Sequence, residues 1–323
     1  MRVVLTALVA VTALTAPLAR ADKWCFVVTG DGRSDTKTAR PQDKNGVNIL
    51  ITGEMAQATI NEKARFLLWT GDLVGGSKGK EDFERELLTW RGLMEPLYSQ
   101  GINVLPVRGN HETHCPEGVE VWNKVFSGKY ALPQNGPASE KNLTFFYESG
   151  PVLVVGLDEY STPKPAINQT WLDATLASHK KPFIFSAGHE AAFMDGHHTD
   201  VLDVNPPARD AFWNSLIKAG ARTFFAGHDH LYDHMLITRE GADPGPELHQ
   251  FVAGTAGAPY YEPGPYTGVN TGWKISRVKA IGRTYGYLLV EVEDNKVTIT
   301  FKGRTAPGVY VPMDSFSYLV PGA

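Results

Sequence analysis

Gly227-His228-Asp229-His230 follows a short apolar run, Thr223-Phe224-Phe225-Ala226, that has the composition of a buried strand. If the backbone stays extended past Gly227, side chains two positions apart point to the same side. His228 and His230 would then present two imidazoles to one point, as metal ligands are presented. A His-x-His pair is a weak signal in a chain with 10 histidines, so its meaning depends on the rest of the sequence.

Four other apolar runs end in the same manner, with glycine followed by a residue that bears oxygen or imidazole ligands. Their endings are Gly30-Asp31, Gly71-Asp72, Gly109-Asn110-His111-Glu112 and Gly188-His189. Each glycine allows the backbone to turn sharply just past the strand. Because ligands of α/β proteins bind beyond the carboxyl ends of parallel strands, we expect the five endings to meet.

Helical patterns separate several of these runs. The clearest covers 81–100, where Phe83, Leu87, Trp90, Met94 and Leu97 recur at three and four residues and form one apolar face. Further helices are predicted over 46–65, 169–178 and 208–219. Strands that alternate with helices indicate βαβ units with a parallel sheet.

After His230 the sequence has strand-like segments and no helical pattern. The segments 235–238, 250–253, 285–293 and 296–302 predict an antiparallel second layer. Neither a linker nor a repeat interrupts the chain. We therefore predict one α/β domain over 22–323, built from two sheets.

The five strand endings carry carboxylates, one amide oxygen and imidazoles. Such a mixed oxygen and nitrogen set suits Zn, Mn, Fe or Ni, and it lacks the thiolates of structural zinc sites. Each of these residues, taken singly, is also a common turn or cap residue, and the prediction depends on their joint occurrence in order.

The set resembles the calcineurin-like metallophosphoesterase superfamily, over nearly all of 22–323. The resemblance implies a four-layer α/β/β/α sandwich of two mixed β-sheets flanked by helices, and a centre of two divalent or trivalent metal ions. By motif, Asp72 would bridge both ions, Asp31 and His230 would hold the first, and Asn110, His189 and His228 the second. His111 matches the histidine that protonates the leaving oxygen.

One motif departs from the family. The first motif is Asp-x-His, whereas this chain has Asp31-Gly32-Arg33. The purple acid phosphatase branch replaces that histidine with a tyrosine three residues after the bridging aspartate, and this position is Gly75 here. Asp35 is a weaker candidate to complete the first metal site. Arg33 cannot be a ligand, because its guanidinium stays protonated, and we predict that it binds a substrate phosphate.

Other conspicuous residues are predicted to be structural. His114, His197, His198 and His234 are expected on exposed loops or in support of the ligands, and Arg108 in an ion pair. The aromatic residues of 258–273 either line the substrate pocket or pack against their own domain; they include Tyr260, Tyr261 and Trp273.

Residues 1–21 read as a secretory signal peptide, with a charged Arg2, an apolar run and the cleavage sequence Ala19-Arg20-Ala21. The prediction is a secreted or periplasmic protein with no membrane span after cleavage. The net charge of −4 gives no electrostatic reason to bind nucleic acid. Cys25 and Cys115 are expected at opposite ends of a sheet, as buried thiols outside a disulfide.

Two functions follow from these features. The first is a secreted metal-dependent phosphohydrolase that cleaves small phosphomonoesters or phosphodiesters by attack of a metal-activated hydroxide. The alternative is a metal-binding or scaffold protein whose first metal site has degenerated with Arg33.

Overall fold

The computed structural model describes residues 24–35, 37, 40–162, 164–194, 197–199, 201–241, 247–265 and 271–322. The predicted signal peptide, 1–21, lies outside these ranges. Within them, no helix combines the length and the apolar character that crossing a bilayer requires.

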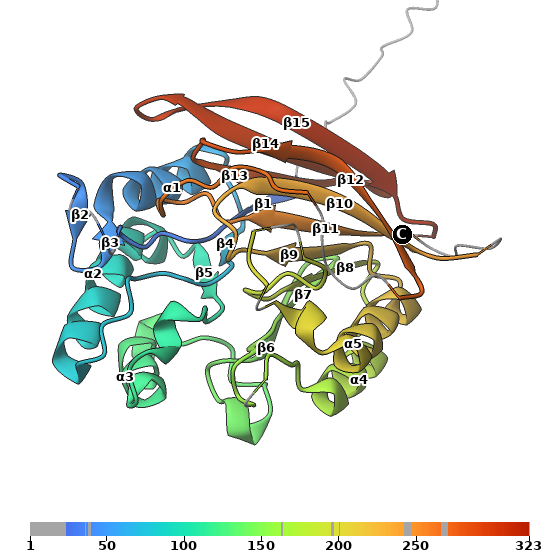
Figure 1. Cartoon of the computed structure of the whole chain (residues 1–323), viewed down its shortest axis with the longest axis horizontal. Helices are drawn as coiled ribbons and strands as arrows, with labels where there is room; N and C mark the ends of the chain where they lie inside the picture. The colour runs from blue at the N-terminus through green and yellow to red at the C-terminus, as the bar shows by residue number, and fades with distance from the viewer. Residues whose placement is uncertain are drawn as a thin grey trace, which may run out of the picture.

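Two mixed sheets form the centre of the protein (Figure 1). The first has the order β15-β14-β13-β1-β4-β5. Its strands are β1 (Trp24–Thr29), β4 (Phe66–Trp69), β5 (Asn103–Pro106), β13 (Gly286–Glu293), β14 (Lys296–Ala306) and β15 (Val309–Leu319). β1, β4 and β5 are parallel neighbours, as the alternation of strands and helices predicts.

The second sheet has the order β12-β10-β11-β9-β8-β7-β6. Its strands are β6 (Phe145–Ser149), β7 (Val152–Gly156), β8 (Phe183–Ala187), β9 (Thr223–Ala226), β10 (Tyr232–Arg239), β11 (Leu248–Ala253) and β12 (Trp273–Ile281). β7, β8, β9 and β11 pair with one another in parallel, in that order. Every residue of β7, β8 and β9 is buried, which explains why their sequences are continuous apolar runs.

The two sheets pack face to face through aromatic side chains. Phe26 of β1 stacks on Phe66 of β4, and it meets Phe185 of β8 edge-on at 5.1 Å between ring centroids. Phe225 of β9 stacks on Phe185. These rings contribute large apolar area to a core that joins both sheets.

Helices cover the outer face of each sheet (Figure 1). α1 (Ile49–Asn61), α2 (Lys80–Tyr98) and α3 (Gly118–Val125) lie with the first sheet, and α4 (Gln169–Ser178) and α5 (Pro206–Ala219) lie with the second. The predicted apolar face of α2 is buried in full. The four-layer α/β/β/α arrangement is therefore confirmed.

Smaller elements refine the predicted boundaries. The predicted helix over 46–65 is shorter, because β2 (Asp43–Lys44) and β3 (Val47–Asn48) form a hairpin before α1. Single turns of 3-10 helix occupy η1 (His111–Thr113), η2 (Gly128–Tyr130), η3 (Ala138–Glu140) and η4 (Leu202–Val204).

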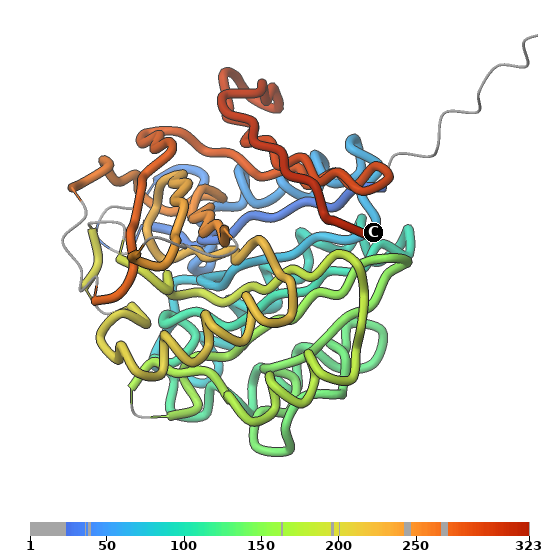
Figure 2. The backbone as a smooth tube through the Cα atoms, turned by 90° about the vertical axis from the view of Figure 1, so that its right-hand side faces the viewer, coloured from blue at the N-terminus to red at the C-terminus, as the bar shows by residue number. Residues whose placement is uncertain are grey.

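The strands after His230 do not form a separate layer, so that part of the prediction is wrong. β10, β11 and β12 extend the second sheet, whereas β13, β14 and β15 extend the first. β11 is also parallel to β9, although an antiparallel layer was expected. Figure 2 shows the result, in which the C-terminal part of the chain, drawn in orange and red, joins the sheet of the first strand, and β13 pairs with β1.

The two cysteines behave as the sequence predicts. Cys25 and Cys115 are both buried, and no disulfide joins them. The fold therefore depends on its apolar core instead of a cross-link.

Candidate metal centre

Asp31 lies just past the end of β1 and is completely buried. A Cβ on Gly30 would lie 2.1 Å from Thr70 Oγ1, so the close approach of β1 and β4 requires glycine there. The Asp31 amide donates to Gly71 O (3.0 Å), and both carboxylate oxygens accept from the His228 amide at 3.2 Å. The backbone of Asp31 is left-handed, with a φ of 62°.

Asp72 follows β4 and also has a left-handed backbone, with a φ of 49°. The Glu112 carboxylate accepts from three backbone amides, those of Asp72 (3.0 Å), Val74 (3.2 Å) and Gly109 (2.7 Å). The buried Glu112 therefore ties the loop after β4 to the loop after β5. This tie holds the Asp72 carboxylate in place between the two sheets.

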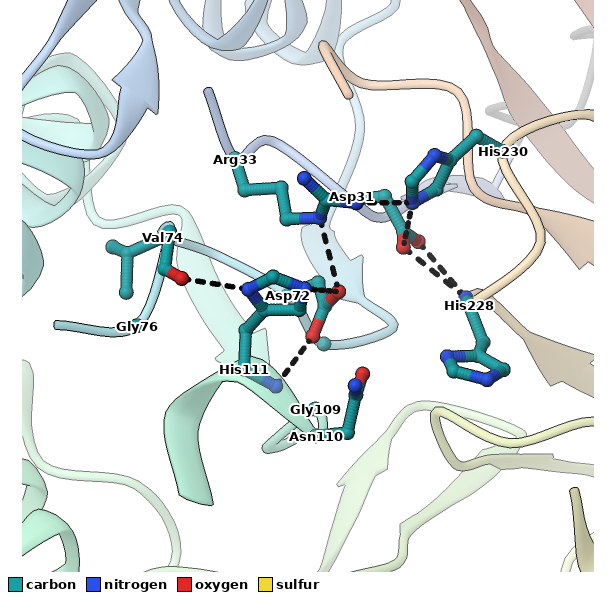
Figure 3. A network of polar contacts seen from close by, with 12 residues as sticks. Asp31, Arg33, Asp72, Val74, Gly76, Gly109, Asn110, His111, His228 and His230 are labelled. Carbon is teal, nitrogen blue, oxygen red and sulfur yellow. Dashed lines mark hydrogen bonds and ion pairs between the residues drawn. The ribbon is translucent and has the colours of Figure 1, made fainter. Parts of the chain in front are cut away.

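His111 begins η1 and points back toward Asp72 (Figure 3). Its amide donates to Asp72 Oδ1 at 3.1 Å, and its Nδ1 donates to Gly75 O at 2.6 Å. Its Nε2 lies 3.8 Å from Asp72 Oδ2, and 15% of the side chain is exposed. The free edge of this imidazole can thus reach a molecule bound at Asp72.

His189 follows β8 and presents a lone pair to the centre. Its Nδ1 lies 2.7 Å from Thr70 O, which can only accept, so the neutral ring carries its proton on Nδ1. Its Nε2 lies 3.1 Å from Asn110 Oδ1 and 3.3 Å from Asp72 Oδ1. Three acceptors therefore converge, which is the arrangement that a cation stabilises.

His228 and His230 do not follow the extended backbone that the sequence predicts. His228 has a φ of 70°, and the Asp229 amide donates back to Gly227 O at 2.8 Å. This turn is what points the His228 amide at the Asp31 carboxylate. His228 Nε2 then faces Glu190 Oε2 at 3.5 Å, whereas His230 Nε2 faces Asp31 Oδ1 at 3.6 Å.

The predicted site residues Asp31, Arg33, Asp72, His228 and His230 are buried, and half-buried Asn110 and His111 lie beside them (Figure 3). His189 is buried too and contacts Asn110 and Asp72. One ligand atom from each of Asp31, Asp72 and His189 lies within 4.8 Å of the others. Arg33 enters this region from the first loop, with Nε 3.5 Å from Asp72 Oδ2 and Nη2 3.4 Å from His230 Nε2. The individual metal-binding and catalytic roles stay predictions.

Burial shifts the pKa values of the groups in this centre. Burial lowers the pKa of His189 to about 4, and burial together with the Arg33 cation lowers the pKa of His230 well below its usual value. Burial and the Asp72 carboxylate raise the pKa of Asp31 well above its usual range and that of Glu112 to about 8. The centre thus gathers neutral imidazoles and crowded carboxylates, which favours cation binding.

Asp72 is an exception among the acids. Burial alone would raise its pKa, but the neighbouring His189, His111 and Arg33 together hold the pKa below its usual value. Asp72, the residue predicted to bridge both metal ions, is therefore an ionised carboxylate.

Sequence reasoning did not assign Glu190 and Tyr160 to the centre. Glu190 faces His228 and accepts from Tyr160 Oη at 2.5 Å; its position directly after His189 is the signal that could have indicated it. Tyr261 stacks on the His230 ring with 4.1 Å between centroids. Tyr261 therefore lies beside the site. This is the first of the two positions that the sequence predicts for the aromatic residues of 258–273.

The remaining predictions have mixed outcomes. Arg108 forms the expected ion pair, with two bonds of 2.8 and 3.0 Å to Asp158. His198 supports the centre, since its Nδ1 lies 2.6 Å from Asp229 Oδ1 and its ring lies against His228. His234 is fully buried in β10, so its predicted place on an exposed loop is wrong.

The other residues singled out in the sequence lie outside the group of Asp31, Asp72 and His189. Asp35 Oδ1 accepts from the Lys37 amide in an exposed bond, which gives it no part in the group of Asp31, Asp72 and His189. His114 and His197 are exposed, as predicted. Tyr260 packs on Tyr285, and Trp273 is a buried residue of β12 that packs near Phe193.

Several known proteins are similar to this chain in sequence or in fold. Purple acid phosphatase 23 of Arabidopsis thaliana is 23% identical over 162 residues, which are 48% of this chain and 34% of that protein. A purple acid phosphatase from yellow lupin (Lupinus luteus) seeds superposes with a TM-score of 0.65 at 14% identity, over 91% of this chain and 53% of that one. This chain thus spans about a third and about half, respectively, of their lengths.

A third similar fold comes from a protein described as an anchor. GAP50 of the Plasmodium inner membrane complex superposes with a TM-score of 0.59 at 15% identity, over 92% of this chain and 89% of that one. The family model for calcineurin-like phosphoesterases matches residues 48–232, more than half of the chain. The protein belongs to the calcineurin-like phosphoesterase family.

Proposed function

We propose that this protein is a metal-dependent phosphohydrolase that cleaves phosphomonoesters or phosphodiesters. The observation that carries the proposal is the convergence of acceptor atoms from Asp72, Asn110 and His189, with the imidazole edge of His111 beside them. Family membership supports a phosphoesterase reaction, and the site supplies both a cation-binding group and a proton donor.

The second half of the centre fits a metal ion. His189 Nε2, Asp72 Oδ1 and Asn110 Oδ1 are acceptors that face one another, and Mn, Fe, Zn or Ni would satisfy all three. His228 completes the predicted set. A metal ion bound there would polarise the phosphoryl oxygens and lower the pKa of a bound water.

The chain's own residues would then orient the substrate and move a proton. His111 Nδ1 donates to Gly75 O, which turns Nε2 toward the centre, and in the protonated ring this nitrogen can donate its proton to the leaving oxygen. Arg33, with 10% of its side chain exposed, can donate from its guanidinium to a phosphate oxygen. The walls around both groups are buried, which strengthens these charged contacts.

A hydrolysis assay tests the proposal. The chain, loaded separately with Mn, Zn, Fe and Ni, should hydrolyse p-nitrophenyl phosphate or its bis-ester. Asp72→Asn and His189→Gln should each lower kcat/KM by about 100-fold or more, which corresponds to about 2.7 kcal/mol of transition-state stabilisation. Glu81→Gln, at an exposed position of α2, should keep the wild-type rate. Absence of hydrolysis with every metal, for these and for a panel of phosphorylated metabolites, would reject the proposal.

A second function is favoured by the position of Arg33. Because the guanidinium lies among the residues predicted for the first metal, the chain is also a candidate binding or scaffold protein. GAP50, which has a similar fold, is described as an anchor. Under this function the chain binds metal and phosphate but turns over none of the substrates.

We further propose that the chain acts outside the cytoplasm on a small phosphorylated molecule. The support is the signal-like sequence of residues 1–21 and the net charge of −4, which disfavours a nucleic acid partner. Intact-mass measurement of the exported protein should show loss of residues 1–21. A full-length mass in the exported fraction would contradict this processing.

A further inference from the structure

The centre has two halves that differ in what lies between their acceptor atoms. In the half formed by Asp72, Asn110 and His189, acceptors face acceptors at 3.1 and 3.3 Å. The Thr70 carbonyl fixes the proton of His189 on the opposite ring nitrogen. A cation bound here would satisfy the lone pairs.

The other half, predicted for the first metal ion, already contains a cation. His230 Nδ1 lies 2.7 Å from Pro259 O, so His230 Nε2 carries the lone pair. Arg33 Nη2 lies 3.4 Å from that lone pair, and Arg33 Nε lies 3.5 Å from Asp72 Oδ2. Two of the atoms predicted to ligate the first metal, Asp72 Oδ2 and His230 Nε2, therefore face a guanidinium.

Arg33 is fixed in this position by its backbone and its burial. It forms an isolated β-bridge with Val47, and the flanking Ser34 amide donates to Gly46 O at 2.9 Å. Nη1 donates to Ser34 O at 3.2 Å. The residue is 8% exposed, so the guanidinium is held inside the protein instead of on a mobile arm.

A guanidinium and a metal ion cannot share this space. The guanidinium keeps its charge at every accessible pH, and it repels a divalent ion brought to the same carboxylate. The family's second ligand in the first motif is also missing, because Arg33 stands where Asp-x-His has histidine. The residues present therefore do not fit a two-metal centre.

We infer that Arg33 is the resident cation of the first position, and that the chain binds a single metal ion, in the half that contains His189. Asp72 Oδ2 and His230 Nε2 then serve as partners of the guanidinium. The pair of a metal ion and a guanidinium supplies positive charge on both sides of Asp72. This pairing of cations holds whether or not the chain hydrolyses phosphoesters.

Metal counting tests the inference without any activity measurement. The full chain is stripped with a chelator, refilled with excess Mn²⁺ or Zn²⁺, desalted and analysed for metal by mass spectrometry, and isothermal titration gives the number of sites. The wild type should hold about one ion per chain. Arg33→His, which restores Asp-x-His, should hold about two, and Arg33→Lys should stay at about one because the charge is kept.

Two histidine variants make the test independent of how well the Arg33 variants fold. His189→Gln should lose the ion, whereas His230→Gln should keep it, because His230 contacts the guanidinium. The double variant Arg33→His/His230→Gln should return to about one ion. Two ions in the wild type, or loss of an ion in His230→Gln, would overturn the inference. Circular dichroism of each variant confirms that the counted protein is folded.

Discussion

Gly109 determines how closely the loop after β5 approaches Asp72. A Cβ at this position would lie 2.3 Å from Asp72 Oδ1 and 2.4 Å from the Asp72 amide nitrogen. Both atoms are held, the first by the His111 amide and the second by Glu112. A methyl group therefore cannot be accommodated without moving the carboxylate on which the metal centre depends.

We predict that Gly109→Ala weakens metal binding about tenfold or more and lowers the free energy of unfolding by about 1–3 kcal/mol, the usual cost of overpacking. Isothermal titration with Mn²⁺ and urea unfolding in the presence of a chelator measure the two effects. Gly92→Ala is the control, since Gly92 lies within α2 and a Cβ added there would meet no atom within 4 Å. It should raise stability by about 0.5–1 kcal/mol. Equal behaviour of the two variants would contradict the role assigned to Gly109.

The sequence indicated several of the residues that the structure brings together, but not their orientations. Glycine followed by aspartate or histidine after an apolar run indicated Asp31, Asp72 and His189, because the carboxyl ends of parallel strands meet. The left-handed backbone of His228 was not predictable, since it depends on an acceptor that is 197 residues away in the chain. The same holds for the guanidinium of Arg33, whose partner His230 is equally distant.

A pair of histidines is buried between β10, β11 and β15. His234 Nε2 and His249 Nδ1 lie 2.9 Å apart, and both rings pack against Phe316 of β15. Burial lowers the pKa of His234 to about 4 and that of His249 to about 3. The acidic groups that face the pair, Asp314 and Glu247, are 4.0 and 3.9 Å away.

This pair should make the folded state sensitive to acid. Both pKa values lie below the unfolded value of ~6.5, so the unfolded chain binds protons first as the pH falls. The contribution of the pair to the free energy of unfolding is fully present above pH ~6.5. It declines between pH ~6.5 and ~4, by up to ~1.4 kcal/mol per pH unit for each histidine. We predict that the free energy of unfolding of His249→Gln falls less steeply with decreasing pH, by the contribution of about one proton. Urea unfolding from pH 7.5 to 4.5 measures this slope.

The control for this measurement is Thr298→Ser, a conservative change on β14. It should retain the wild-type slope. An unchanged slope in His249→Gln would show that the pair does not govern the acid sensitivity, even if the variant is less stable at every pH.

Strands in the interior of each sheet were predicted well, whereas two of the four edge strands were not. β12 and β15 were missed, and both are edges. β15 contains Pro312, which is normally a signal against a strand, but an edge strand tolerates it and the pairing with β14 shifts register at that point. Lys274, Arg277 and Lys279 interrupt the apolar residues of β12. This strand therefore lacks the apolar run that identified the buried strands.

The first and last parts of the chain depend on each other. β1 lies between β13 and β4, and Trp24 to Val28 pair with 288–292. The residues that match the family model, 48–232, contain neither β1 nor β13. Asp31 is carried by β1, so the metal centre also requires the C-terminal strands.

We predict that a chain ended after residue 282 does not fold cooperatively, because β1 then has an open edge and the inner face of its sheet loses the apolar residues of β13 and β14. Urea unfolding followed by tryptophan fluorescence should lose its sigmoidal transition, and hydrogen exchange of β1 should become fast. A chain that lacks only 321–323 should unfold as the full chain does. A sharp transition at the wild-type midpoint in the shorter chain would contradict this dependence.

The two-sheet architecture was predictable, whereas the distribution of the C-terminal strands was not. Apolar runs with glycine-led endings were enough to indicate a parallel core. The partner of each later strand is set by contacts far along the chain, such as β13 with β1, and no local pattern encodes them. This is why the strands after His230 were assigned to one layer although they complete two.

The left-handed backbones of Asp31, Asp72 and His228 affect how long the protein resists degradation. Each such conformation costs a non-glycine residue about 1 kcal/mol or more, so these three positions lower the stability of the native chain. A metal ion at 100 times its Kd returns about 2.7 kcal/mol and reduces the unfolded fraction about 100-fold. We therefore expect proteases to remove the protein faster where metal is scarce, so that its abundance follows metal supply without any dedicated regulator.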